Sequence, residues 1–133
     1  CGADGVHVGQ KDRAAREVRR LLGPNRILGV SARTVEQAVQ AERDGADYLG
    51  VGAVFSTSTK ADAMPVSYET LQAICRAVSI PVVAIGGIQR ENLLSLAGSG
   101  VDGLALVSAI FAAPDVETAS RELRALSEAM VRA

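Results

Sequence analysis

The chain has 133 residues, and its 48% hydrophobic and 22% charged residues form a mixture typical of a single globular domain. A net charge of −1 and an aromatic content of 3% argue against nucleic acid or an anionic membrane as a partner. The longest apolar stretch, 81–88, is too short to span a membrane. The two cysteines form no disulfide framework and no metal-binding spacing, so we expect a reduced, cytoplasmic setting.

Five strands are predicted in chain order, and three of them follow the same short phrase of Gly, one further residue and Asp. In this phrase the Gly can end a helix in the left-handed conformation, and the Asp closes the turn before a β-prone segment. The phrase precedes the expected strands at 6–8, 48–55 and 104–108, whereas those at 26–31 and 80–85 lack it.

Helices are predicted between and after these strands, where apolar residues recur three and four positions apart. Thr34 and Gln37 form a predicted capping box at the start of one helix, and Ser67 is a predicted N-cap of another. The expected helices cover 15–22, 35–42, 71–78, 93–97 and 116–130, with a short additional turn at 109–112.

The alternation of strands and helices predicts an α/β fold with a parallel sheet and right-handed crossovers. Two architectures fit this pattern: an open doubly wound sheet, and part of an eight-stranded (β/α)8 TIM barrel. Candidate functional residues after every strand, and the short helical turn after the last one, favour the barrel. Five strands cannot close a barrel, so we expect either a sheet that stays open or strands that are missing from the chain.

Hydroxyl and lysine side chains follow the strand at 48–55, in the run Thr57, Ser58, Thr59 and Lys60. Hydroxyls and loop amides donate hydrogen bonds and the ammonium adds a compact charge, so the run suits a phosphorylated ligand. A solvated loop lysine is the plain alternative. The neighbouring hydroxyls and the position at a strand end favour the ligand.

A second phosphate-binding pattern joins the ends of the last two strands. Gly86 and Gly87 follow one strand, and Val107 and Ser108 end the next, directly before the short helical turn. Backbone amides of a Gly pair and of a helix start can point at one anion. The two glycines alone would equally indicate a tight turn, but their combination with Ser108 favours a phosphate cup.

Asp12 and Ser31 each have two interpretations. Asp12 could ligate Mg²⁺, which takes oxygen ligands, but its place before the helix at 15–22 favours N-capping. Ser31 could donate to an anion, or only begin the turn toward Thr34. His7, the sole histidine, alternates with apolar neighbours, and we expect a satisfied core residue rather than a catalyst.

Six segments, spread in order over essentially all 133 residues, carry a resemblance to a known family. They read VHVGQKD at 6–12, ILGVSA at 27–32, GADY at 45–48, TSTK at 57–60, AIGGI at 84–88 and VSAIF at 107–111. Together they resemble the thiamine phosphate synthases. These transferases of thiamine biosynthesis join a pyrimidine diphosphate to a thiazole phosphate and release pyrophosphate. The ordered set is far more specific than any one segment.

The resemblance implies a (β/α)8 barrel of which 1–133 is one partial domain, from the fourth strand through the last helix. Members of the family carry three more strands ahead of this segment, with the first metal-binding aspartate and several residues for the pyrimidine diphosphate. The chain also lacks a starting Met. We therefore expect part of a longer polypeptide that is inactive alone, and its homo-oligomeric state is left open.

The resemblance also implies a role for each matched residue. Asp12 matches one of two Mg²⁺-binding aspartates, which would replace the capping interpretation, and Ser31 and Lys60 match residues that hold the diphosphate. Lys60 is the expected catalytic residue, because its charge neutralises the departing pyrophosphate. Residues matched to the thiazole phosphate are Thr57, Ser58, Thr59, Gly87, Val107 and Ser108.

Two other functions stand as alternatives. The thiazole tautomerases share the implied fold, but they carry a His where this chain has Ala53 and lack the T-x-T-K run, so the sequence favours the synthase. A truncated barrel could also bind a phosphate ester without any turnover.

Overall fold

Five parallel strands form a single sheet in the computed structural model of this chain, which describes residues 2–56 and 64–133. The predicted run from Thr57 to Lys60 lies outside the described residues. The strands, which lie side by side in their chain order, are β1 (Gly5–Val8), β2 (Ile27–Ala32), β3 (Tyr48–Val51), β4 (Val82–Ile85) and β5 (Gly103–Ala105).

The sequential strand order decides between the two predicted architectures. In a doubly wound sheet the order reverses at a switch point, so neighbouring strands are not always consecutive in the chain. Here every neighbouring pair is consecutive and parallel, as in a TIM barrel. The described residues therefore form a TIM-barrel-like arc of five strands with two free edges, β1 and β5.

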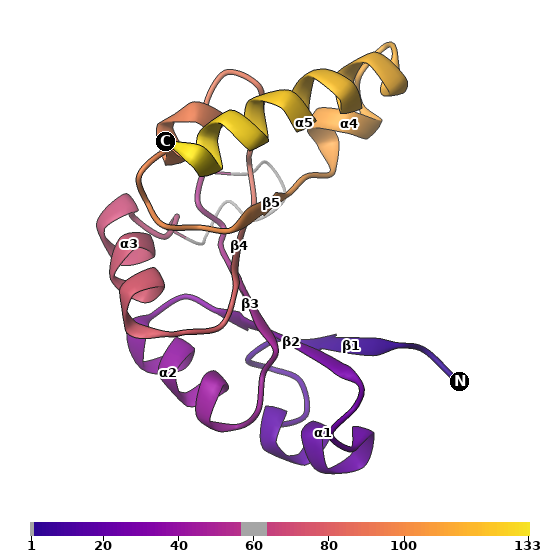
Figure 1. The fold of residues 1–133 in the computed structure, drawn as a ribbon, viewed down its shortest axis with the longest axis vertical. Helices are drawn as coiled ribbons and strands as arrows, with labels where there is room; N and C mark the ends of the chain where they lie inside the picture. The colour runs from indigo at the N-terminus through magenta and orange to yellow at the C-terminus, as the bar shows by residue number, and fades with distance from the viewer. Residues whose placement is uncertain (1, 57–63) are drawn as a thin grey trace.

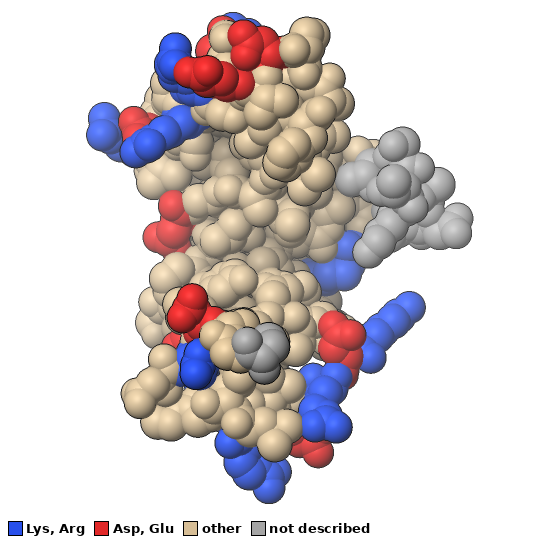
Figure 2. Space-filling model, turned by 90° about the vertical axis from the view of Figure 1, so that its right-hand side faces the viewer, with Lys and Arg blue, Asp and Glu red and all other residues tan. Residues whose placement is uncertain are grey.

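The helices follow one another along the outer side of this arc and leave its inner face uncovered (Figure 1). Figure 2 turns the uncovered inner face toward the viewer. Charged side chains gather near the two ends of this view, and its middle is largely uncharged. No helix in the described ranges is long and apolar enough to cross a membrane. The helices are α1 (Ala15–Leu22), α2 (Val35–Arg43), α3 (Tyr68–Ala77), the 3-10 helix η1 (Leu93–Leu96), α4 (Ser108–Phe111) and α5 (Val116–Arg132).

The core lies between the sheet and the helices, because alternate residues of each strand point outward. Leu28, Val30 and Ala32 of β2 are at most 3% exposed, and Leu49 and Val51 of β3 are fully buried. Burying each large aliphatic side chain stabilises the fold by about 1.5–3 kcal/mol. The strand residues between them face the uncovered side, and these are the residues that can meet a ligand.

The predicted helix starts at Thr34 and Ser67 are confirmed. The Thr34 hydroxyl accepts from the Gln37 amide at 3.1 Å, and the Ser67 hydroxyl accepts from the Thr70 amide at 3.1 Å. The Gln37 side chain closes the box one residue earlier than expected, because it accepts from the amide of Arg33 at 2.9 Å.

Several element boundaries and one helix type differ from the prediction; for example, α3 begins at Tyr68 rather than at residue 71. β3 ends at Val51 rather than at residue 55, because Val54 and Phe55 donate backbone hydrogen bonds to the carbonyls of Ile85 and Gly86 outside the regular ladder. β5 is likewise shorter than predicted and ends at Ala105, since Ser108 already begins α4. The segment expected as an α-helix at 93–97 is the 3-10 helix η1.

The Gly-x-Asp phrase fastens neighbouring strands at the amino-terminal end of the sheet. Asp47 accepts from the Leu28 amide at 2.7 Å, while its own amide donates to the Leu28 carbonyl at 2.7 Å. Asp102 repeats the arrangement with Val82, at 2.9 and 2.8 Å. Each aspartate therefore satisfies both backbone groups of one residue in the preceding strand.

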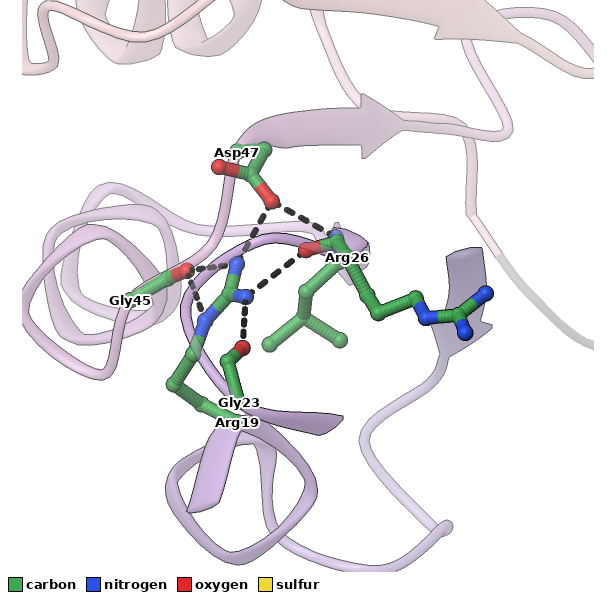
Figure 3. Close-up of polar contacts among 6 residues, drawn as sticks. Arg19, Gly23, Arg26, Gly45 and Asp47 are labelled. Carbon is green, nitrogen blue, oxygen red and sulfur yellow. Dashed lines mark hydrogen bonds and ion pairs between the residues drawn. The ribbon is translucent and has the colours of Figure 1, made fainter. Parts of the chain in front are cut away.

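Arg19 of α1 reinforces the first of these pairs (Figure 3). Its guanidinium contacts the Asp47 carboxylate and also donates to the Gly45 carbonyl at 3.0 and 2.7 Å. Two further carbonyls, those of Gly23 and Arg26, accept from the same guanidinium. The Leu28 amide, followed by the Arg19 guanidinium, lowers the pKa of Asp47 below its usual range.

Candidate active site

A cup formed by backbone lies where β4 and β5 end. Gly86 and Gly87 follow β4 with φ values of +98° and +68°, a conformation that favours glycine. A Cβ atom on Gly87 would lie 2.8 Å from the Phe55 carbonyl oxygen, and one on Gly86 would lie 2.5 Å from the Cβ of Ala53. Both glycines are therefore required by conformation and by space.

Side chains around this cup hold a serine hydroxyl at its edge. The side-chain amide of Gln89 donates from Nε2 to Oγ of Ser108 at 2.9 Å, which leaves the Ser108 hydroxyl proton available to another acceptor. The side chain of Asn92 donates to the Gly87 carbonyl at 3.0 Å and accepts from the backbone N–H of Gln89 at 2.8 Å, so it fixes the turn after β4.

The cup encloses a hollow of about 510 Å³. Its residues include Gly87, Val107 and Ser108, so the structure brings together all three described residues that were predicted to hold one phosphate. Ser56, which directly precedes the predicted loop at 57–60, also lines it. Backbone amides near glycine turns and at the start of a helix point partial positive charge into such a hollow, which suits an anion.

Asp12 lies in the loop after β1 and does not cap a helix. The N-cap of α1 is Ala14, which makes no side-chain capping bond, so the capping interpretation is wrong. Instead, the Asp12 carboxylate accepts from the Gly9 amide at 2.7 Å, and the Asp12 amide donates back to the Gly9 carbonyl at 3.2 Å. The tight local turn occupies one carboxylate oxygen, Oδ2, and holds the carboxylate near the carboxyl end of β1.

The chemistry of Asp12 fits a Mg²⁺ ion only as one ligand among several. Mg²⁺ takes oxygen ligands in near-octahedral geometry, and it commonly uses one or two carboxylates with water and substrate phosphates. The described residues contain no group of three or more His, Cys, Asp or Glu side chains placed to hold a metal. Asp12 therefore suits a shared site completed by a phosphorylated ligand, and not a protein-only cage.

Ser31 meets two neighbours on the uncovered face of the sheet. Its hydroxyl oxygen lies 2.8 Å from Nε2 of His7, and Nδ1 of that histidine lies 2.9 Å from the Tyr48 hydroxyl. The Gln10 amide donates to the Ser31 carbonyl at 2.7 Å. Ser31 is therefore held from both sides, in a position open to a ligand, and it does not merely begin a turn.

Sequence reasoning missed His7 and Tyr48 as members of this cluster. His7 is satisfied by hydrogen bonds as predicted, but it is exposed on the inner face rather than in the core. Its alternation with Val6 and Val8 did place it on the opposite face from Val8, which is buried. The sequence signal that could have found the cluster was that Ser31, in the neighbouring strand, falls on the same face of the sheet as His7.

The comparison with known proteins settles the family. A sequence profile of the thiamine monophosphate synthase family matches residues 1–110. The chain belongs to this family. The resemblance seen in its motifs is thereby confirmed.

Members of the family share high identity with this chain. The thiamine-phosphate synthase of Ruminiclostridium cellulolyticum is 57% identical over 122 residues, which cover 92% of this chain and 58% of that protein. That of Chloroflexus aurantiacus is 56% identical over 125 residues, covering 93% and 57%. The structure of a thiamine phosphate pyrophosphorylase from Pyrococcus furiosus matches with a TM-score of 0.87 at 43% identity, covering 97% of this chain and 61% of that one. The chain thus spans less than two thirds of these relatives.

Proposed function

We propose that the protein carrying this chain is a transferase that joins 4-amino-2-methyl-5-hydroxymethylpyrimidine diphosphate to 4-methyl-5-hydroxyethylthiazole phosphate. The products are thiamine phosphate and pyrophosphate. Membership of the thiamine monophosphate synthase family is the observation that carries the proposal. The cup between β4 and β5 supports it independently, because the reaction needs an anchor for a phosphate monoester.

In this proposal the cup holds the thiazole phosphate. The phosphate oxygens would accept hydrogen bonds from the backbone N–H groups of Gly87 and Val107 and from the hydroxyl of Ser108. Thr57, Ser58 and Thr59 would complete the anchor from the loop after β3. Fixing the thiazole by its phosphate places its ring nitrogen for attack, which lowers the entropic part of the barrier.

The diphosphate of the pyrimidine substrate would lie near Ser31 and Lys60. Breaking the bond between carbon and the diphosphate oxygen leaves negative charge on pyrophosphate and positive charge on the carbon, which the electron-rich aminopyrimidine spreads. The Ser31 hydroxyl and the Lys60 ammonium would stabilise the departing oxygens, with Lys60 as the catalytic residue. Mg²⁺, held in part by Asp12, would neutralise further charge on the diphosphate.

The arc of five strands would be the fourth to eighth strands of a closed (β/α)8 barrel, forming with its helices one partial domain over 1–133. The share of each relative that the chain covers, 57–61% in the three named above, supports this assignment. Three further strands would supply the rest of the pyrimidine site, so the 133 residues alone would be inactive. A cytoplasmic setting is supported by the low cysteine content.

The test is to incubate the full polypeptide that carries this chain with both substrates and Mg²⁺, and to measure thiamine phosphate and pyrophosphate together. Equal amounts of the two products are expected. Ser108→Ala should raise KM for the thiazole phosphate, whereas Ser127→Ala, at a serine of α5, should leave it unchanged. Isomerisation of the thiazole without pyrophosphate release, or phosphate binding without any product, would contradict the proposal.

A further inference from the structure

Three side chains from three adjacent strands form a continuous hydrogen-bonded relay on the uncovered face of the sheet. Tyr48 of β3 contacts Nδ1 of His7 at 2.9 Å, and Nε2 of His7, in β1, contacts Oγ of Ser31 in β2 at 2.8 Å. The relay therefore ends on the one strand-end hydroxyl of this face that is proposed to meet the diphosphate.

Two glycines make room for the rings of this relay. A Cβ on Gly29 would lie 2.2 Å from Cζ of Tyr48, and a Cβ on Gly50 would lie 3.2 Å from Cε1 of His7. Gly29 pairs in register with both His7 and Tyr48, and the two rings lie 5.5 Å apart at 41°. The rings thus occupy space that any other residue at position 29 would fill.

The direction of the hydrogen bonds decides what Ser31 can do. A neutral imidazole has one N–H donor and one acceptor nitrogen, so two proton arrangements satisfy both contacts. If Nε2 carries the proton, it donates to Ser31, and the Ser31 proton is free for an anion. If Nδ1 carries the proton, Nε2 instead accepts a hydrogen bond from the Ser31 hydroxyl. That hydroxyl then presents only lone pairs to an anion.

The Tyr48 hydroxyl favours the first arrangement. A phenol is a stronger hydrogen-bond donor than an aliphatic alcohol, so the tyrosine, and not the serine, supplies a proton to the imidazole acceptor. The amide of Gln10 donates to the Ser31 carbonyl at 2.7 Å and fixes the backbone from which the hydroxyl projects.

We infer that Tyr48 is a positioning residue: through the tautomer of His7, it keeps the hydroxyl proton of Ser31 available to an anionic diphosphate ligand. The identity of that ligand rests on the proposed function, whereas the proton order within the relay does not. In this inference Tyr48 acts through its hydrogen bond to His7.

The tautomer can be read directly, because His7 is the sole histidine of this sequence. The full polypeptide is labelled with ¹⁵N-histidine, His7→Gln identifies the His7 signals, and two-bond proton–nitrogen correlations are recorded at pH about 8.5, where imidazoles are generally neutral. The wild type should show a protonated Nε2. Tyr48→Phe keeps the ring over Gly29 and should shift the population toward a protonated Nδ1.

Tyr68→Phe is the matched control, because the chain has two tyrosines and the Tyr68 hydroxyl donates to the Ala97 carbonyl, away from the relay. It should leave the His7 tautomer unchanged. A wild type with protonated Nδ1, or a Tyr48→Phe protein with an unaltered tautomer, would overturn the inference. Loss of the folded state is monitored by the melting temperature of each variant.

Binding of inorganic pyrophosphate with Mg²⁺ tests the link to the ligand. Tyr48→Phe should weaken it about tenfold, the loss of one hydrogen bond to a charged group. In a Ser31→Ala background, Tyr48→Phe should cause no further loss. Equal losses in both backgrounds, or none in either, would overturn the role of Tyr48. If the proposed reaction were absent but both the tautomer shift and the coupled binding loss appeared, only the proposed function would fail.

Discussion

The two ends of the sheet use polar groups in opposite ways. At the amino-terminal end, Asp47 and Asp102 have their carboxylates occupied by backbone amides of the neighbouring strand. At the carboxyl-terminal end, the cup places donors beside a hollow that a ligand can fill, and the relay, which begins at Tyr48 directly after Asp47, ends on this side at Ser31. The difference teaches that the repeated phrase of the sequence stabilises the fold, whereas the residues proposed to bind ligands lie outside the repeat. Substitutions at the two ends should therefore have separable effects.

The largest effect is expected from Lys60→Ala. Removing the ammonium should lower kcat of the full polypeptide by about 10²–10³, the cost of losing one charge-stabilising donor at the departing group. The melting temperature should stay within a degree or two of the wild type. Arg132→Ala, which removes one positive charge at the end of α5, is the control and should leave kcat unchanged. Near-normal turnover of the Lys60 variant would remove that residue from the mechanism.

The next effect is expected from Gly87→Ala. A side chain at φ +68° and within 2.9 Å of the Phe55 and Ser56 carbonyl oxygens must distort the cup, so KM for the thiazole phosphate should rise at least about tenfold. Gly103→Ala is a matched control, because its Cβ would meet no atom within 4 Å. Equal kinetic effects of the two substitutions would show that the cup does not hold the phosphate.

A smaller effect is expected from Asp12→Asn. One charged oxygen ligand would be lost from a shared site, so the Mg²⁺ concentration needed for half-maximal turnover should rise about tenfold, while kcat at saturating Mg²⁺ changes less. Titration of turnover with Mg²⁺ measures this shift. Glu128→Gln, on the exposed side of α5, serves as the control. An unchanged Mg²⁺ requirement would argue that Asp12 only closes its local turn with Gly9.

The smallest effect on catalysis, and the clearest effect on stability, is expected from Asp47→Asn. The variant should lose about 1–2 kcal/mol of unfolding free energy near neutral pH, because the Leu28 amide and Arg19 lose a charged acceptor that solvent partly screens. Its kcat should match the wild type. Urea unfolding and steady-state kinetics on the same samples measure both, and a fall in kcat without a loss of stability would break the comparison between the two ends.

The same pair of proteins gives a pH test with a defined sign. The pKa of Asp47 is lowered in the folded protein, so its contribution to stability is complete above the unfolded pKa of about 3.9 and is lost as the pH falls through the lower folded value. The difference in unfolding free energy between wild type and Asp47→Asn should therefore be constant near neutrality and shrink in acid. A difference that grew as the pH fell would contradict the assigned interaction.

Much of the fold could be predicted because its signals are local. Periodicity gave the α-helices, side-chain caps at Thr34 and Ser67 gave two helix starts, and the Gly-x-Asp phrase marked three strand starts. The ends of β3 and β5 could not be predicted from local pattern, since apolar residues continue beyond both strands. Val54 is still buried, but its amide bonds to β4 outside the ladder.

The candidate site was predictable where backbone geometry carries it, and not where partners come from other strands. Gly86, Gly87 and Ser108 mark the cup by their residue types and strand-end positions. Asp12 was harder, because a carboxylate before a helix can cap that helix or close a turn, and only the contact with Gly9 distinguishes the two. The His7 cluster depends on strand register, which places His7, Tyr48 and Ser31 on one face.

Asp4 stands before β1 as Asp47 stands before β3 and Asp102 before β5. In the two later cases the aspartate binds the amide and carbonyl of a residue near the start of the preceding strand. By analogy with these two, we expect the amide and carboxylate of Asp4 to be able to bind the backbone of a strand added at the β1 edge. This contact would favour a parallel strand in a single register. The negative charge of Asp4 would also oppose non-specific pairing of other strands with the β1 edge.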